Sequence, residues 1–348
     1  MKVEKKQQLL RWYMEGEQKA INIKTVPYMG IEPLKELVNK VLYDGGRVLY
    51  ITGEMKEHVL ISQYMRNLGF SSISLHQDLE INEKESLVIC DYFQALRIRE
   101  QYDLVVYDDV NSFPIHKKPE MQHLIGFIFP RCKKVVAYSF ETVFMGMDVL
   151  EVPMAGRSGF VSEPRVIETR LNLDEFVPTS VYEYLLWFVY EKKKVLFLTA
   201  DKKVKRKVAR FLSKVDESLE SCIFDVDEIG TKTMKELVKD LEKPYIFITD
   251  DLDDYLDVET NFEIIIHGSD SSRYSYRELL FLCLRTGFYE EMNGEVIMLC
   301  QHITRDMERT KELTRHFNKI LCSVKSFQYT PHPHTCSSLM HEATIIQA

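Results

Sequence analysis

Short apolar runs alternate along the chain with segments in which apolar residues recur every three or four positions. Runs of this length are typical of buried strands, and the longer-period segments are typical of amphipathic helices. The predicted strands are 47–52, 72–76, 86–90, 104–108, 134–139, 165–171, 195–200, 222–226, 245–250, 263–268 and 295–300. The clearest predicted helices are 32–43 and 201–212. This alternation predicts an α/β fold whose parallel sheets are covered by helices on both faces.

A group of prolines and glycines divides the chain into two halves. It interrupts the pattern between 151 and 180 at Pro153, Gly156, Gly159, Pro164 and Pro178. A chain of 348 residues is long enough for two domains of ordinary size. We therefore predict one α/β domain over 1–155 and a second over 165–325, with ligands bound outside the carboxyl ends of the strands. The last stretch, 326–348, has no clear periodicity and is predicted to be a flexible tail.

The charge, the apolar pattern and the cysteine content argue against several classes of protein. The formal net charge of −8 argues against a dedicated nucleic-acid-binding protein, which is usually basic over at least one face. No apolar stretch is long enough to span a bilayer, and the first residues lack the apolar core of a signal peptide. We therefore expect a cytoplasmic protein without membrane insertion. The seven cysteines include no CxxC pair, and Cys322, His332, His334 and Cys336 match no standard zinc spacing, so no zinc is expected.

The clearest candidate for chemistry is the run "YDLVVYDDVNSFP" at 102–114, which ends on Asp108 and Asp109. In nucleotide hydrolases, acids at the end of a buried strand hold Mg²⁺ and orient water. A phosphate loop of the form GxxxxGK[ST] should accompany them, but the chain contains no match. Met29-Gly30-Ile31 occupies the place where Gly-Lys-Thr would open the first helix. Lys24 and Thr25 lie nearby and are the candidate substitutes, with Gly30, for binding phosphate.

Four segments in this order resemble superfamily 2 helicases, and most closely the late competence ATPase family ComFA. They are "EPLKELVNKVLYDGGRVLYITGE" at 32–54, "SLVICDYFQALRIREQYDLVVYDDVNSFP" at 86–114, "FLCLRTGF" at 281–288 and "NGEVIMLCQHITRDMERTKELTRHFNKILC" at 293–322. The resemblance covers roughly residues 20–322 and implies two RecA-like parallel-sheet domains in tandem. It also implies ATP and Mg²⁺ as ligands, with Asp108 as the Mg²⁺ ligand, and DNA uptake during competence as the setting.

The sequence departs from the family at several functional positions. Gly30 and Ile31 replace the phosphate lysine and its hydroxyl neighbour, and Asp109 is one methylene shorter than the family's glutamate. The motif that couples the domains corresponds to Tyr138-Ser139-Phe140. Of two arginines that reach the nucleotide from the second domain, Arg285 remains and Phe288 replaces the other. Loss of an arginine finger costs about 10³–10⁵ in rate, so these changes predict a pseudo-helicase with weak or no ATP turnover.

A basic segment offers a candidate nucleic-acid contact. It comprises Lys202, Lys203, Lys205, Arg206 and Lys207, and its apolar neighbours recur at helical spacing. The cations therefore form either an ordinary solvated face or a patch that contacts the phosphates of single-stranded DNA. The acidic run "DDLDDYLDVE" at 250–259 is either a solvated loop or a surface for a basic protein partner.

Three functions therefore remain open. The first is a pseudo-helicase that binds single-stranded DNA or a competence-type protein partner. The second is an active DNA-dependent ATPase that uses Lys24, Thr25 and Gly30. The third is a protein-interaction scaffold that uses neither nucleotide nor DNA. Trp12 and Trp187 are interpreted as core or interface anchors in each case.

Overall fold

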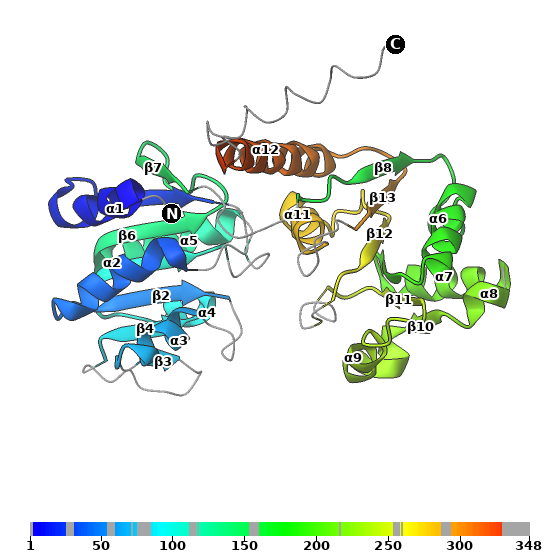
Figure 1. Cartoon of the computed structure of the whole chain (residues 1–348), viewed down its shortest axis with the longest axis horizontal. Helices are drawn as coiled ribbons and strands as arrows, with labels where there is room; N and C mark the ends of the chain where they lie inside the picture. The colour runs from blue at the N-terminus through cyan, green and yellow to red at the C-terminus, as the bar shows by residue number, and fades with distance from the viewer. Residues whose placement is uncertain are drawn as a thin grey trace, which may run out of the picture.

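The fold consists of two α/β lobes that are joined along one side (Figure 1). The computed structural model describes residues 3–25, 31–53, 60–70, 72–74, 85–110, 116, 118–152, 160–215, 217–252, 258, 260–286 and 294–328. Each lobe is built on an all-parallel sheet covered by helices, which is the arrangement of two RecA-like domains in tandem. The fold class predicted from the sequence is confirmed.

The first lobe contains a seven-stranded sheet in the order β3-β4-β2-β5-β6-β1-β7. Its strands are β1 (Ala20–Lys24), β2 (Val48–Thr52), β3 (Ser72–Ser74), β4 (Leu87–Cys90), β5 (Tyr102–Asp108), β6 (Cys132–Ser139) and β7 (Asp148–Glu151). Its helices are α1 (Val3–Glu15), α2 (Glu32–Tyr43), α3 (Leu60–Asn67), α4 (Tyr92–Ala95) and α5 (Lys118–Ile128). The central strands are buried along nearly their whole length because helices cover both faces of the sheet.

The second lobe contains a six-stranded sheet in the order β10-β11-β9-β12-β13-β8. Its strands are β8 (Arg165–Glu168), β9 (Lys194–Thr199), β10 (Ile223–Asp225), β11 (Tyr245–Thr249), β12 (Glu263–His267) and β13 (Val296–Cys300). Its helices are α6 (Thr179–Tyr190), α7 (Lys202–Val215), α8 (Glu217–Glu220), α9 (Val226–Leu237), α11 (Tyr276–Arg285) and α12 (Arg305–Gln328). Helix α12 therefore extends to Gln328, and the rest of the predicted tail lies outside the described residues.

The structure adds two strands that the apolar pattern did not predict. Strand β1 is buried between β6 and β7, yet its sequence AINIK carries a polar residue, Asn22, at its centre. Strand β7 lies at the edge of the sheet and exposes three of its four residues, so it lacks an apolar run. Both strands escape a search for apolar runs because neither has two buried apolar faces.

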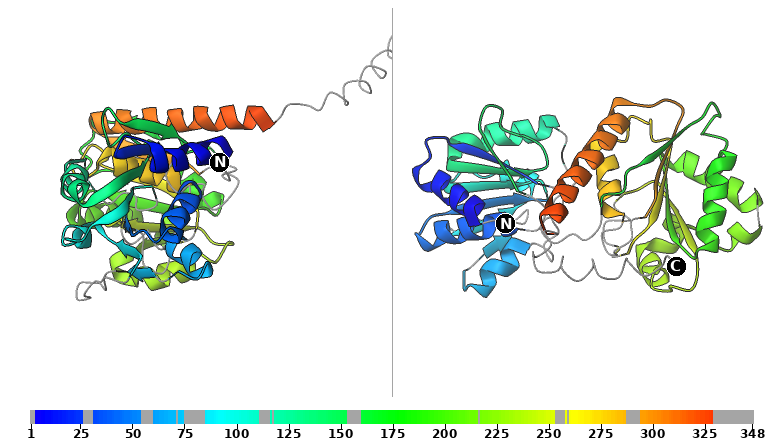
Figure 2. Two further views of the ribbon diagram at one scale, coloured as in Figure 1. Left: turned by 90° about the vertical axis from the view of Figure 1, so that its left-hand side faces the viewer. Right: turned by 45° about the horizontal axis from the view of Figure 1, so that its top comes forward.

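Two helical layers enclose the second sheet, and one of them meets the first lobe. Helices α6 and α7 share a core cluster on one face of the sheet. Helices α9, α11 and α12 share the cluster on the other face, and Phe140 of the first lobe belongs to that cluster. The right-hand view of Figure 2 shows α11 and α12 between the two sheets. Among the described residues, none of the helices combines the length and apolar character needed to cross a bilayer.

Candidate functional site

The ends of neighbouring strands β5 and β6 bring the candidate acids to the junction of the lobes. Asp108 is the last residue of β5 and pairs in register with Tyr138 of β6. The backbone N–H of Asp109 donates to the Tyr138 carbonyl at 2.9 Å. Because parallel strands end at the same edge, Asp109 and Ser139 then lie side by side. Both acids are buried, with 0% and 2% of their surface exposed.

Both carboxylate oxygens of Asp108 accept hydrogen bonds from other groups of the protein. The hydroxyl of Tyr50, on neighbouring strand β2, donates to Oδ2. The backbone N–H of Val110 donates to Oδ1 at 3.0 Å. Both oxygens therefore accept hydrogen bonds from within the first lobe.

Asp109 instead joins the two lobes. Ser139 donates to its Oδ2 at 2.8 Å, and the guanidinium of Arg277 on α11 forms an ion pair with Oδ1. The Arg277 side chain is 3% exposed, so both charges are removed from water. A buried charge is tolerated when it is paired and hydrogen-bonded, and each of these charges needs the other.

The start of α11 fixes the position of Arg277. Ser275 caps the helix and forms a capping box with Glu278, which places Arg277 in the first turn. The Arg277 guanidinium carbon lies 4.7 Å from the centre of the Phe140 ring, within the range of a cation–π contact. Burial lowers the pKa of Arg277, but the adjacent Asp109 carboxylate outweighs this and raises it. The guanidinium therefore stays charged.

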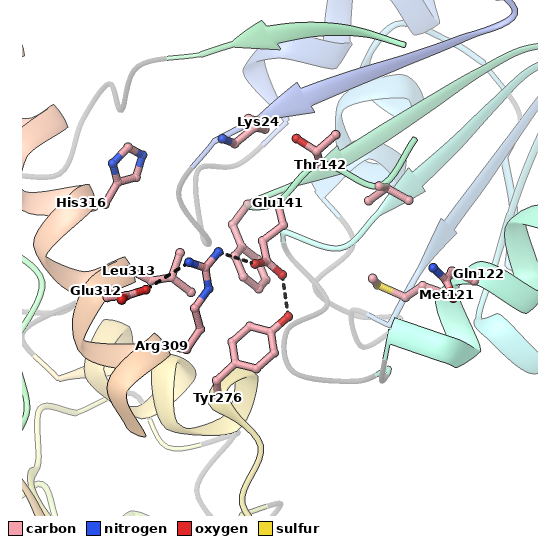
Figure 3. Close-up of a pocket in the computed structure, with 12 residues that line it drawn as sticks. Lys24, Met121, Gln122, Glu141, Thr142, Tyr276, Arg309, Glu312, Leu313 and His316 are labelled. Carbon is pink, nitrogen blue, oxygen red and sulfur yellow. Dashed lines mark hydrogen bonds and ion pairs between the residues drawn. The ribbon is translucent and has the colours of Figure 1, made fainter. Parts of the chain in front are cut away.

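A second polar contact links the lobes beside the first. Glu141 follows β6 and accepts a hydrogen bond from the Tyr276 hydroxyl at 2.5 Å. Its other carboxylate oxygen pairs with Arg309 of α12 at 3.0 Å, and Arg309 also contacts Glu312 at 3.3 Å (Figure 3). Burial, and then the bond to Glu141, raise the pKa of Tyr276, which keeps its hydroxyl a donor.

These contacts form one wall of a pocket of roughly 720 Å³ between the lobes. The first lobe contributes Lys24, Phe140 and Glu141, and Arg309 and His316 line it from α12 (Figure 3). The volume falls within the usual range for small-molecule sites. Both positive and negative side chains line it, so it does not present a uniformly cationic cradle for phosphates.

Asn22 holds the loop that lines this pocket. Its side-chain oxygen accepts from the backbone N–H groups of Val143 and Phe144 at 2.9 and 2.8 Å. Its amide donates to the carbonyls of Phe144 and Asp148 at 2.9 and 3.3 Å. The polar residue at the centre of β1 therefore satisfies the loop backbone after β6 and explains its burial.

Of the predicted phosphate-binding residues, the structure describes Lys24 and Thr25, at the end of β1. Lys24 lines the pocket and lies 3.7 Å from Glu151. Thr25 is buried at the end of β1, and its backbone N–H donates to the Ser139 carbonyl at 3.1 Å. Gly30 and Phe288 lie outside the described residues. Arg285 donates to the Val258 carbonyl at 3.0 Å, within its own lobe.

The basic segment lies in the first half of α7, but its cations have different environments. Lys202, Lys203 and Arg206 are exposed, and Lys207 is half-buried. Lys205 is 1% exposed and pairs with three aspartates at 2.7–3.1 Å: Asp225, Asp227 and Asp250. Lys205 therefore neutralises acids inside the second lobe, and the prediction that it belongs to a solvated or phosphate-binding face is wrong. Most of the acidic run 250–259 lies outside the described residues.

The acid pair does not fit the Mg²⁺ site that the helicase resemblance implies. Protein-bound Mg²⁺ retains several waters and takes open carboxylate oxygens as ligands. Asp108 is fully buried with both oxygens hydrogen-bonded, and Asp109 is paired with Arg277. Among the described residues, no group of three or more histidine, cysteine or carboxylate side chains could hold a metal ion.

Sequence reasoning missed the side chains that join the lobes: Arg277, Tyr276, Glu141 and Arg309. One signal for Arg277 was present, because a charge near the start of the apolar helix YRELLFLCLR needs a partner. The identity of that partner depends on how the lobes pack, which no local pattern reveals.

No protein-family model matches the chain, and no curated protein matches it in sequence.

Proposed function

We propose that the chain is a degenerate ComFA-like helicase core that acts by binding, with little or no ATP turnover. Its partner is single-stranded DNA or a protein that takes part in DNA uptake. The observation that carries the proposal is the buried ion pair between Asp109 and Arg277. An active enzyme would need the acid at this position to orient water, but here the carboxylate holds the lobes together.

Two further observations support a binding role. Asp108 is satisfied by Tyr50 and Val110, so it offers no open oxygen for a metal. Phe140 packs into the core of the second lobe, so separating the lobes would expose a buried aromatic side chain. An ATP-driven motor must open and close its lobes in each cycle, and the Asp109–Arg277 ion pair and the Phe140 contact both oppose opening.

The alternative of an active ATPase gains some support from the pocket beside Lys24, which is large enough for a nucleotide. Its mixed lining argues against the alternative, because Glu141 and Glu312 lie where phosphates would need cations. A scaffold without nucleotide or DNA would use the same lobe junction, and it differs in predicting no DNA binding at low salt.

The test is to measure ATP·Mg²⁺ binding by calorimetry and ATP hydrolysis with and without an oligodeoxythymidylate. We expect neither heat of binding nor turnover above that of the Asp108→Ala variant. The Arg277→Gln variant is the matched control, because it releases Asp109 without removing an acid. DNA-stimulated turnover in the natural chain that disappears in Asp108→Ala would overturn the proposal and favour the ATPase.

A further inference from the structure

The side of the second lobe that faces away from the first lobe combines exposed aromatic rings with cations. Helices α6, α7 and α8 lie on this side (Figures 1 and 2). Residues of α6 and α7 share one core cluster, so both helices cover the same face of the sheet. Their other sides therefore both point away from the sheet.

Helix α6 exposes aromatic side chains where a surface helix normally carries polar ones. Its 12 residues, TSVYEYLLWFVY, contain a single charge, Glu183. Trp187 is 47% exposed and Tyr190 is 83% exposed. Trp187 lies edge-on to Tyr184 at 6.5 Å, and Tyr184 accepts a hydrogen bond from Arg165 at 2.6 Å, which holds that ring in place. Trp187, predicted to be a core or interface anchor, thus keeps about half of its surface exposed to solvent.

Helix α7 supplies the positive charge. Its sequence KKVKRKVARFLSKV contains seven cations and no acid, and Lys205 is the one that is buried. Lys203, Arg206, Arg210 and Lys214 are exposed. This concentration is local, because the chain as a whole carries a net charge of −8.

The chain order aligns the aromatic and basic positions. Helix α6 leads into β9 and α7 follows it, so both helices run against that strand and end at the same end of the lobe. The last turns of α6, with Trp187 and Tyr190, then lie level with the last turns of α7, with Arg210 and Lys214. A strand of several nucleotides can therefore run from the rings of α6 to the cations of α7.

We propose that the outer helix surface, formed by Trp187 and Tyr190 with Arg206, Arg210 and Lys214, binds a single-stranded polynucleotide. Its phosphates pair with the α7 cations, and its unpaired bases stack on the α6 rings. The α7 cations match a polyanion, and the exposed α6 rings match unpaired bases, which a single strand presents together. A duplex would present its phosphates but keep its bases stacked inside. The proposal rests on the proposed function, since it gives that function's DNA partner a location.

The experiment measures binding of the full chain to a fluorescent oligodeoxythymidylate of about 12 nucleotides, by anisotropy across a range of salt concentrations. The charge-reversal variant Arg206→Glu/Arg210→Glu should weaken binding at least about tenfold and lower the salt slope by about 1.4, the value for two lost contacts. Lys232→Glu/Lys239→Glu is the matched control, because both lysines are exposed at or near α9 on the opposite face of the same lobe. That control should bind as the natural chain does.

Base stacking on the α6 rings is tested separately with the variants Trp187→Leu and Tyr190→Leu. Each should weaken binding about tenfold without changing the salt slope, because each removes a stacked base and no phosphate contact. Base stacking should also quench the fluorescence of Trp187, while Trp12 is buried in the first lobe and gives a constant background. Circular dichroism checks that each variant remains folded.

Different negative results of these binding experiments would refute the outer helix surface and the proposed function. Tight binding that neither the arginine nor the aromatic variants reduce would overturn the outer helix surface and leave a DNA-binding function at another site. Equal affinity for duplex and single strand, with no effect of Trp187→Leu, would overturn the stacking role. Absence of binding at low salt would refute both the surface and the DNA-binding form of the proposed function.

Discussion

Removal of Arg277 is the most direct test of the junction between the lobes. Arg277→Met keeps much of the aliphatic volume beside Phe140 but leaves the Asp109 carboxylate buried without its counter-ion. Breaking a buried pair from one side costs about 3–5 kcal/mol. Here the loss of stability has an upper limit, because the lobes can separate and let water reach the Asp109 carboxylate. We therefore expect a loss of about 3 kcal/mol, or an expanded molecule in which the lobes have come apart.

The assay exploits the two tryptophans, since Trp12 lies in the first lobe and Trp187 in the second. Urea unfolding followed by fluorescence gives the stability, and small-angle X-ray scattering gives the radius of gyration. The matched control is Arg309→Met, which removes an arginine from the same junction but from a pair that is 47% and 23% exposed. That control should cost at most about 1 kcal/mol.

The paired variant Asp109→Leu/Arg277→Met completes the test. It removes both charges, so most of the lost stability should return. If Arg277→Met changes neither the stability nor the radius of gyration more than Arg309→Met does, the ion pair does not hold the lobes together. Asp109 would then be available for a catalytic role.

Three other substitutions probe the core of each lobe. Burial lowers the pKa of His267 to about 4, although the Phe176 carbonyl and nearby Asp174 and Asp270 act in the opposite direction. Neutral His267 therefore contributes its full share to the free energy of unfolding above pH 6.5, and this contribution is lost as pH falls toward 4. Between pH 7 and pH 5 the natural chain should therefore lose about 2 kcal/mol more than His267→Gln, and equal pH slopes in urea titrations would disprove this. Lys205→Met leaves three aspartates without their ammonium and should cost the second lobe about 3–5 kcal/mol by the same titration, whereas exposed Lys203→Met should be neutral. Asn22→Leu removes partners from the Val143 and Phe144 backbone and should cost about 3 kcal/mol, and an unchanged thermal midpoint would contradict this.

The sequence predicted most strands because burial on both faces leaves a local record. Strands such as β5 and β11 are continuous apolar runs, and the period of the pattern alone identifies them. Strand β1 could not be found in this way, since the reason for Asn22 lies in a loop more than 120 residues away. The edge strand β7 is mostly exposed and leaves no such record.

The candidate site was predictable only in part. The strand-end position of Asp108 and Asp109 follows from local sequence, and the structure places both acids there. Their partners do not follow, because Arg277 reaches Asp109 across the junction from 168 residues away. Lys205 illustrates the same limit, since its helical spacing matched that of its exposed neighbours. Its burial depends on aspartates from other elements.

The position of Phe140 limits how the two lobes can change in evolution. Its side chain completes the apolar core of the lobe to which it does not belong. If the second lobe were expressed without the first, the apolar residues that surround Phe140 would be exposed to water. Exposed apolar surface of this kind promotes aggregation. The two halves therefore cannot be exchanged as independent modules, and changes at position 140 should be accompanied by changes in the residues that surround it.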